Sequence, residues 1–184
     1  MGTKRIINLR SLNRALGRVI DELDRHGFWT EKIYSVDVYL VPLGAALGWF
    51  WKNGNGQICI PAVSFGDLGR LFRRKKACSL ADIIRHEYGH AVAHHYRGLI
   101  RSRRFSDAFG ASYFSDTSFE YDEDFHVTEY AASEPAEDFA EVFMLYLKHD
   151  GRLPASYSTP WIRKKWAFVR QLSTMIRKGK ARWD

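Results

Sequence analysis

The chain has 184 residues, of which 46% are hydrophobic and 15% aromatic, and its formal net charge is +7. This composition excludes a disordered chain and predicts one globular domain, or one domain whose two lobes flank a cleft. No apolar run is long enough to span a membrane and the start MGTKRIINLR lacks a signal-peptide apolar region, so the sequence predicts a cytoplasmic protein. The two cysteines, Cys59 and Cys78, favour reduced thiols, with a single disulfide as the alternative.

The first part of the chain predicts scaffold elements. A helix is expected over residues 11–26, with Ser11 as its N-cap and Gly27 ending it, and a β-strand is expected over residues 34–41. The apolar residues that we expect on the inward face of this helix are Leu12, Leu16, Val19, Ile20 and Leu23.

A β-hairpin is predicted over residues 49–60. The segment NGNG separates WFWK from QICI, and Asn and Gly readily adopt the positive φ angles of a tight hairpin turn. Trp49 and Trp51 are interpreted as core residues, because aromatic side chains usually bury. The basic run at 70–76 is interpreted as a solvated connector.

The segment SLADIIRHEYGHAVAHHY, residues 79–96, carries the zinc-protease pattern His-Glu-x-x-His. Histidines four residues apart lie one turn apart on one helix face, so His86 and His90 can bind the same Zn²⁺ ion. Glu87 is then placed to act as general base towards water. A pattern with three fixed positions also arises by chance on polar helix faces, so a third ligand is needed to support it.

The setting of this motif is helical. Ser79 is the expected N-cap, Asp82 suits the first turn, and Gly98 is expected to stop the helix. His94 lies one turn beyond His90, where it could tune the metal or touch a substrate; we favour its interaction with the helix dipole. The residues expected on the buried face are Ile84, Tyr88, Ala91 and Val92, with Gly89 and Ala93 allowing close packing.

Residues 101–127 show no sustained period, and we interpret them as either a lid over the cleft or a surface excursion. His126 could line the cleft in the first case. A second helix is predicted over residues 134–148, with Glu134, Glu137 and Glu141 on one polar stripe. Its periodicity leaves both Glu134 and Glu137 as candidate third ligands.

A last amphipathic helix is expected to begin at Thr159-Pro160. The predicted fold class is α+β and zincin-like: a small, mainly antiparallel sheet and the His-Glu-x-x-His helix form one lobe, residues 1–98. A mostly helical second lobe, residues 99–184, carries the glutamate helix and the C-terminal helix, across a cleft from the first.

The segments RHEYGHAV and EYAASEPAEDFAEVF together resemble the catalytic centre of the anthrax lethal factor group of gluzincins, which are zinc peptidases with a glutamate as third ligand. The resemblance covers about a third of the chain. It implies a Zn²⁺ site in which His86, His90 and Glu137 are the metal ligands and Glu87 is the general base. It also implies that Tyr130 directs its hydroxyl towards the oxyanion.

The same resemblance assigns Glu141 as the carboxylate behind a ligand histidine. Asp138 departs from the family pattern, which is aromatic at this position. In peptidases of this kind a strand at the cleft rim binds the substrate through main-chain hydrogen bonds. The predicted hairpin, or the stretch after it, is the candidate for that strand.

The function expected from this resemblance is a zinc-dependent metalloendopeptidase acting on a peptide or protein substrate. Residues 119–141 hold nine acidic and no basic residues, whereas residues 151–184 hold nine basic residues and one acidic one. One alternative is therefore a nucleic-acid-associated module or a protease of DNA-bound proteins, but ordinary solvated faces explain the charges more simply. Another alternative is a catalytically silent partner-binding domain, although Glu87 is present. The sequence predicts no oligomeric state.

Overall fold

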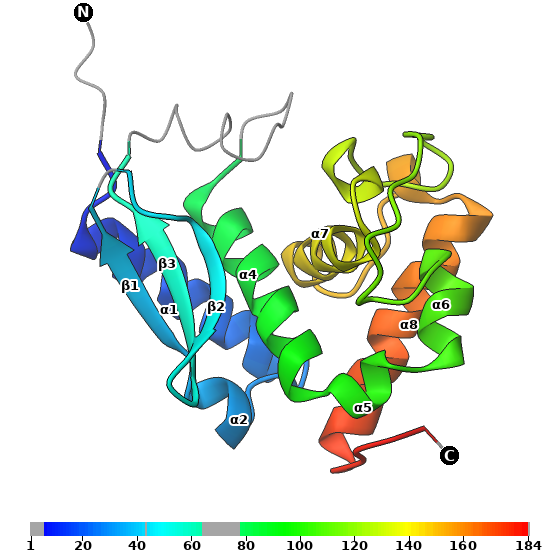
Figure 1. Ribbon diagram of the computed structural model, residues 1–184, viewed down its shortest axis with the longest axis horizontal. Helices are drawn as coiled ribbons and strands as arrows, with labels where there is room; N and C mark the ends of the chain where they lie inside the picture. Colours follow the sequence, from blue (N-terminus) through cyan, green and yellow to red (C-terminus); the bar gives the residue numbers. More distant parts are fainter. Residues whose placement is uncertain (1–5, 43, 64–77, 184) are drawn as a thin grey trace, which may run out of the picture.

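The computed structural model describes residues 6–42, 44–63 and 78–183 (Figure 1). The basic run at 70–76, predicted as a solvated connector, lies outside the described residues. Within these three ranges no helix combines the length and the apolar character needed to cross a membrane. Cys59 and Cys78 are both free thiols, as predicted.

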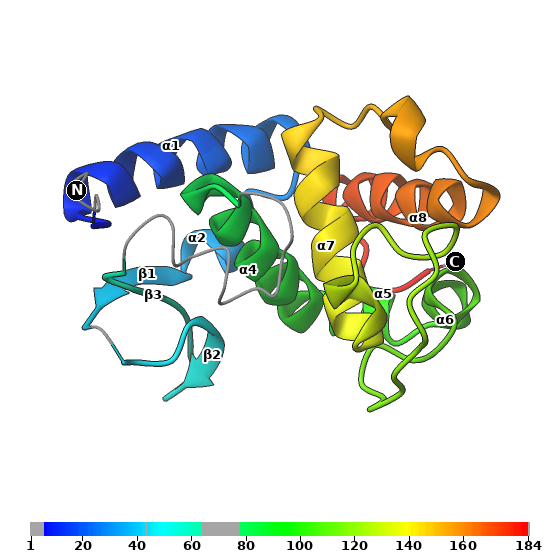
Figure 2. The same cartoon turned by 90° about the horizontal axis from the view of Figure 1, so that it is seen from above.

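The described part of the chain has an α+β fold, as predicted. Its elements are α1 (Leu9–Arg25), α2 (Glu31–Tyr34), β1 (Asp37–Val41), β2 (Gly48–Lys52), β3 (Asn55–Pro61), α4 (Leu80–His95), α5 (Arg97–Ile100), α6 (Arg103–Phe109), α7 (Pro135–Lys148) and α8 (Pro160–Arg177), with 3₁₀ turns at Tyr130–Ala132 and Ala155–Tyr157. The sheet lies on one side of α4, and α6, α7 and α8 lie on the other (Figure 2). The helix with the histidine motif is therefore central.

The sheet has three strands in the order β1-β3-β2 and is mixed. β2 pairs with β3 antiparallel, through a turn in which Asn53 and Gly54 have φ angles of 54° and 80°, so the predicted hairpin is confirmed. β1 pairs with β3 parallel. The prediction of a mainly antiparallel sheet is therefore wrong. β2, the first strand of the hairpin, pairs along one edge of β3. β1 follows α2 and pairs along the other edge, running in the same direction as β3.

Side-chain caps set where the helices begin. The N-cap of α1 is Asn8 and not the predicted Ser11: Asn8 Oδ1 accepts from the Ser11 amide and Ser11 Oγ accepts from the Asn8 amide, both at 3.0 Å. Ser11 is thus the other half of a capping box, which sequence inspection mistook for the cap itself. Ser79 is confirmed as the N-cap of α4 and exchanges the same pair of bonds with Asp82, both at 3.1 Å.

The end of α4 differs from its prediction. The helix is capped by Tyr96, and Gly98 lies inside the following short helix α5. A Cβ atom at Gly98 would lie 2.4 Å from the carbonyl oxygen of Ala181. Gly98 is therefore needed for the close approach of the C-terminal segment rather than to stop α4.

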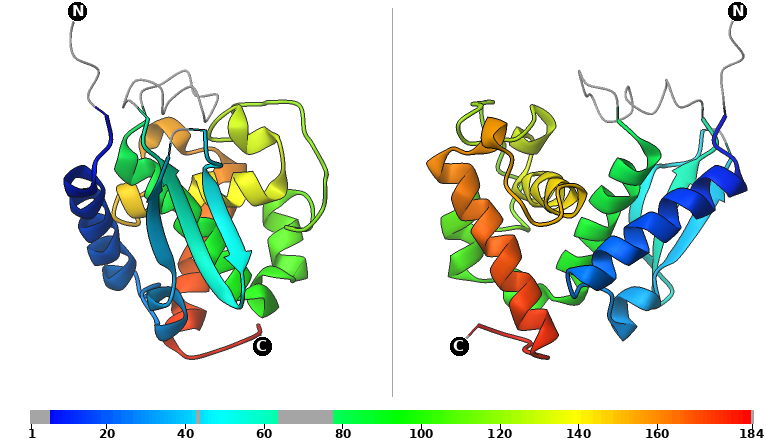
Figure 3. Two further views of the ribbon diagram at one scale, coloured as in Figure 1. Left: turned by 60° about the vertical axis from the view of Figure 1, so that its left-hand side comes forward. Right: turned by 180° about the vertical axis from the view of Figure 1, so that it is seen from behind.

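Helices α4 and α7 lie side by side and form the centre of the core (Figure 3). Gly89 permits this contact, because a Cβ atom there would lie only 3.1 Å from Ala140 Cα. Phe139, Val142 and Phe143 of α7 are fully buried. The distance between the two helices is thus set by Gly89, which lies in the turn between the two motif histidines, and by Ala140 on α7.

A buried ion network orients α4. The Arg85 guanidinium donates to both carboxylate oxygens of Glu22 on α1, at 2.6 and 2.7 Å, and to Asp82 at 2.7 Å. Lys148, at the end of α7, donates to the other oxygen of Asp82 at 3.1 Å. Removing one partner of such a buried set typically costs about 3–5 kcal/mol. The network therefore fixes how α4 is placed against α1 and α7.

The region 101–127 contains one helix that its sequence did not reveal. α6 is capped by Ser102 at its start and ends at Gly110, whose φ is 83°. Its seven residues are too few to show a period, yet Phe105 and Phe109 are buried. Beyond Gly110 the chain stays irregular up to residue 129.

Candidate metal centre

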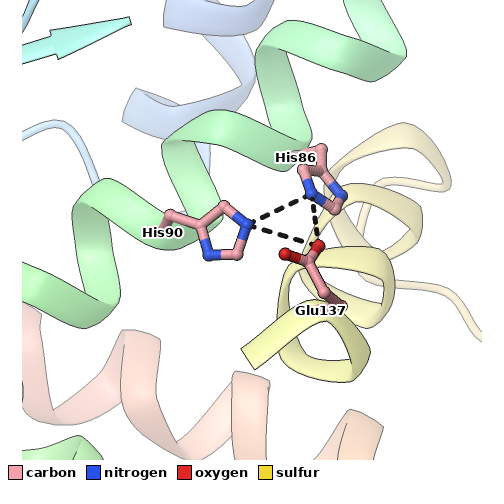
Figure 4. Close-up of side chains that lie close together, drawn as sticks. All are labelled: His86, His90 and Glu137. Atoms are coloured by element: carbon pink, nitrogen blue, oxygen red, sulfur yellow. Dashed lines mark hydrogen bonds and ion pairs between the residues drawn. The ribbon is translucent and has the colours of Figure 1, made fainter. Parts of the chain in front are cut away.

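Three side chains from two helices converge on one point (Figure 4). His86 Nε2 lies 3.2 Å from His90 Nε2 and 3.0 Å from Glu137 Oε2, and His90 Nε2 lies 3.5 Å from the same oxygen. This is the predicted ligand set, and it is the group within the described ranges whose atoms are placed to hold a metal ion. Glu134, the competing candidate, is the exposed N-cap residue of α7.

The spacing of these atoms fits a small tetrahedral cation. Bonds of about 2.0–2.1 Å to nitrogen and oxygen would separate the ligand atoms by about 3.3–3.4 Å, and the observed separations of 3.0, 3.2 and 3.5 Å bracket this value. Glu137 Oε2 is buried, and its neighbours are the Nε2 atoms of His86 and His90. Two imidazole nitrogens and a carboxylate oxygen therefore face a common centre, which is the chemistry of a metal site.

The imidazole of His86 is fixed from behind by Glu141, as the family resemblance predicted. His86 Nδ1 lies 2.8 Å from Glu141 Oε1, and the other oxygen of this carboxylate accepts a hydrogen bond from Thr128 Oγ1 at 3.0 Å. Glu141 is fully buried. A carboxylate in this position holds the proton on Nδ1 and leaves the Nε2 lone pair to face the centre.

The imidazole of His90 is held by Tyr113, and the sequence did not predict this contact. Its hydroxyl lies 2.9 Å from His90 Nδ1, so that Nε2 faces the centre when Nδ1 donates. Burial raises the pKa of Tyr113, and the nearby charge of Glu137 raises it further, so the phenol keeps its proton. Tyr113 is 23 residues from His90, in the irregular stretch after α6, and no local pattern signals such a contact.

The cluster attracts positive charge. Burial lowers the pKa of His86, but hydrogen bonds to Glu137 and Glu141 outweigh this effect and raise it to about 10. Burial raises the pKa of Glu137, but hydrogen bonds to His86 and His90 bring it well below its usual range. The raised pKa of His86 favours a proton on its imidazole, and a metal ion would compete with that proton. Metal binding is therefore expected to release a proton.

Glu87 lies beside the cluster, on the predicted face. It is 4% exposed, and burial raises the pKa of its carboxyl, against the opposing charges of His86 and His90. The backbone amide of Trp49 on β2 donates to this carboxylate. A Cβ atom at Gly48 would lie 3.9 Å from Glu87 Oε2. A buried carboxylate with a raised pKa, held by one backbone donor, is suited to accept and return a proton.

Tyr130 is also at the cluster. Its ring centroid lies 5.8 Å from that of His86, and its hydroxyl forms a hydrogen bond with the side chain of Glu137. Burial, followed by the charge of Glu137, raises the pKa of the phenol, so it remains a hydrogen-bond donor. The 3₁₀ turn at Tyr130–Ala132, just before α7, turns this side chain back towards the histidines.

A pocket of about 580 Å³ opens at the cluster, and strand β2 forms one wall. Its lining residues are Ala46, Leu47, Gly48, Trp49 and Phe50 from β2 and the segment before it, with His86, Glu87, His90, Tyr130 and Glu137. β2 is an edge strand that pairs only with β3 within the described sheet. The predicted hairpin therefore supplies an edge strand beside the candidate metal ligands.

Trp49 is partly buried against the core, but Trp51 is 48% exposed and stacks on His94 with ring centroids 4.4 Å apart, so its assignment to the core is wrong. Trp51 is on the same face of β2 as Trp49 but lies next to the hairpin turn, where less of the core covers it. His94 contacts Trp51 and Arg97 and does not line the pocket. His126 does not line it either; it faces a different pocket, beside α8.

Comparison with known protein families, with curated protein sequences and with solved structures finds no match for this chain. The assignment of function therefore depends on the geometry of the candidate centre and on the resemblance of its two motifs.

Proposed function

We propose that this protein is a zinc-dependent metalloendopeptidase. The observation that carries the proposal is the convergence of His86, His90 and Glu137 on one point at the floor of a pocket, with Glu87 and Tyr130 beside it. Two imidazoles and one carboxylate leave a fourth tetrahedral position open, which is typical of a catalytic zinc site rather than a structural one. When bound, zinc lowers the pKa of water and polarises a carbonyl group.

Four further residues of this chain have roles in the proposed reaction. Glu87 accepts the proton of the attacking water and passes it to the leaving amine, for which its buried carboxylate and raised pKa are suited. Tyr130 donates its hydroxyl proton in a hydrogen bond to the substrate oxygen as that oxygen gains negative charge. Glu141 and Tyr113 keep the two imidazoles in the orientation in which Nε2 faces the centre.

Strand β2 is the proposed docking edge for the substrate backbone. An extended peptide can add to a free edge through main-chain hydrogen bonds, which fixes its direction while leaving its sequence open. Leu47, Trp49 and Phe50 line the pocket along this edge. The substrate class is therefore an extended peptide or an unfolded segment of a protein.

The test combines metal analysis with cleavage of a proteome-derived peptide library. The wild-type chain is expected to bind one zinc ion and to cleave peptides. Glu87→Gln is expected to keep the zinc and the fold while hydrolysis falls by about 10²–10⁴, the usual size of a general-base contribution. Glu31→Gln, an equal change at an exposed glutamate on α2, is the matched control and should behave as wild type. A zinc-loaded wild type that cleaves nothing, or an unchanged Glu87→Gln, would rule the proposal out.

A further inference from the structure

A second pocket, of about 760 Å³, is lined by α6, the loop at 119–126 and the first half of α8. It shares no lining residue with the first pocket. Its lining residues come from α6 (Asp107, Ala108, Phe109), from Gly110, from the loop before the Tyr130 turn (Phe119, Glu120, Tyr121, Asp122, Glu123, Phe125, His126) and from α8 (Trp161, Lys165). Nothing in the proposed peptidase reaction uses these residues.

The walls of this pocket are aromatic and its rim is acidic. Phe125 and Trp161 stack with ring centroids 4.6 Å apart, and Phe119 lies against His126 at 5.8 Å. The rim carboxylates of Asp107, Glu120, Asp122 and Glu123 are all exposed. Aromatic faces and carboxylates both favour a positively charged guest, the faces through their ring quadrupole and the carboxylates through charge.

His126 supplies a second, independent indication of a ligand. It is 6% exposed, it lines the pocket, and its Nδ1 has no hydrogen-bond partner among the described residues. The ring also forms a hydrogen bond with the backbone of Asp122, and when Nε2 is the donor in that bond, Nδ1 is left as an acceptor. Burial and the charge of Lys165 lower its pKa to about 4, so the ring is neutral at pH 7. A buried acceptor without a donor costs free energy that a guest N–H group would recover.

Lys165 is the basic residue among those that line the pocket, and its ammonium group is paired with Asp138. Its Nζ donates to Asp138 Oδ2 at 2.5 Å and to the carbonyl oxygen of Phe125. The same Nζ lies 5.8 Å from the Phe109 ring centroid, and Lys164 Nζ lies 5.7 Å from that of Trp161. Ammonium groups of the protein thus already lie over the Phe109 and Trp161 rings, and the net charge of the lining is negative.

We propose that this second pocket binds an organic cation carrying N–H donors, a guanidinium or primary ammonium group, between Trp161, His126 and the carboxylates of Asp122 and Glu123. The group donates to His126 Nδ1 and to the rim carboxylates while its flat or alkyl part covers the aromatic wall. Arginine and lysine side chains of a peptide have this chemistry, and so do free guanidines and amines. The site does not depend on the metal centre and can be tested without it.

The first experiment uses N-acetyl-L-arginine methylamide and its citrulline counterpart, in which a neutral ureido group replaces guanidinium. Binding to the full-length Glu87→Gln chain is measured by calorimetry, so that no peptide is consumed. The arginine compound is expected to bind saturably and the citrulline compound about tenfold more weakly or not at all. Equal binding of the two compounds, or no saturable binding of either below about 10 mM, overturns the proposal.

A second arm separates the two sources of the cation. Tighter binding of a blocked Gly-Gly-Arg-Gly-Gly peptide than of agmatine assigns the pocket to a basic peptide segment. Equal or tighter binding of agmatine assigns it to a small-molecule cation. In both results the pocket is a cation site, and the chemistry of the guest is the same.

Variants place the binding in this pocket. Asp122→Asn with Glu123→Gln removes two rim charges and is expected to weaken binding about tenfold, whereas Asp116→Asn with Glu31→Gln removes two exposed charges elsewhere and should leave it unchanged. His126→Leu should abolish the ligand-induced shift of one histidine ¹⁵N resonance, with the melting temperature as a check on folding. Equal effects of the two double variants would show only a general attraction by net charge and would refute the site.

Discussion

Glu141 Oε1 lies 2.8 Å from His86 Nδ1, so the two residues form a carboxylate–imidazole pair that joins α7 to α4 at a fully buried position. The other Glu141 oxygen accepts a hydrogen bond from Thr128, which makes the carboxylate a bridge between the loop before α7 and helix α4. The orientation of His86 is therefore held by a residue that does not itself reach the centre.

The first prediction follows from this pair. Glu141→Gln keeps the size of the side chain and removes the charge that holds the proton on Nδ1, so zinc affinity should fall by about 10–100-fold. The measurement is competition with a chromophoric chelator. Glu134→Gln, at the exposed start of the same helix, is the control and should bind zinc as wild type. Unchanged affinity in Glu141→Gln would remove the assigned role.

The second prediction concerns Tyr130. Tyr130→Phe keeps the ring beside His86 and removes only the donor, so turnover on a cleavable peptide should fall at least tenfold, about 1.4 kcal/mol. Zinc content and melting temperature should change little. Steady-state kinetics with kcat and KM determined separately provide the measurement. A variant with wild-type kcat would show that the phenol only anchors its loop.

The third prediction concerns the spacing of the two ligand helices. Gly89→Ala would place a Cβ atom 3.1 Å from Ala140 Cα, and since the contact is with backbone, α4 and α7 must move apart. We expect a loss of about 1–3 kcal/mol in the free energy of unfolding and weaker zinc binding. Gly17→Ala is the matched control, because nothing lies within 4 Å of its added Cβ on α1. There the better helix propensity of alanine should stabilise the protein by about 0.5–1 kcal/mol.

The fourth prediction is a pH dependence of stability. The pKa of His126 is about 4 in the folded protein, lowered from 6.5 by burial and by Lys165. Between these values the unfolded chain binds more protons than the folded one, so this stabilisation is present above pH 6.5 and is lost as the pH falls towards 4.

Urea unfolding at pH 7 and pH 5 provides the measurement. His126→Leu should lose about 1–2 kcal/mol less than wild type between these two values. His95, whose pKa is also about 4, keeps part of the dependence in the variant. Parallel losses in the two proteins would show that His126 is protonated in the folded state at pH 5.

Local patterns predicted the half of the site that lies on one helix. The i, i+4 spacing of His86 and His90 needs only regular helix geometry, and the capping box at Ser79 marks where that helix begins. The choice of Glu137 followed mainly from the likeness of two motifs, since periodicity alone left Glu134 as a competing candidate. What joins these segments is the packing of α4 on α7, which the glycine at 89 permits.

The sequence did not predict features that depend on distant contacts. Tyr113 lies 23 residues after His90, in the irregular stretch that follows α6. No sequence spacing therefore predicts its contact with His90. The parallel pairing of β1 with β3 depends on which edge the hairpin leaves free, and strand propensity carries no information on direction. Ser11 and Asn8 are both good caps, and only the backbone geometry decides between them.

Glu137 and Asp138 are consecutive residues of α7, yet one faces the candidate metal ligands and the other holds Lys165 at the second pocket. A small rotation or shift of this helical turn therefore moves both carboxylates together. By thermodynamic linkage, any change that a guest in the second pocket makes to zinc affinity must be matched by an equal factor in the effect of zinc on that guest. A metal titration with and without the arginine compound would thus measure the coupling free energy between the two sites, which this helical turn connects.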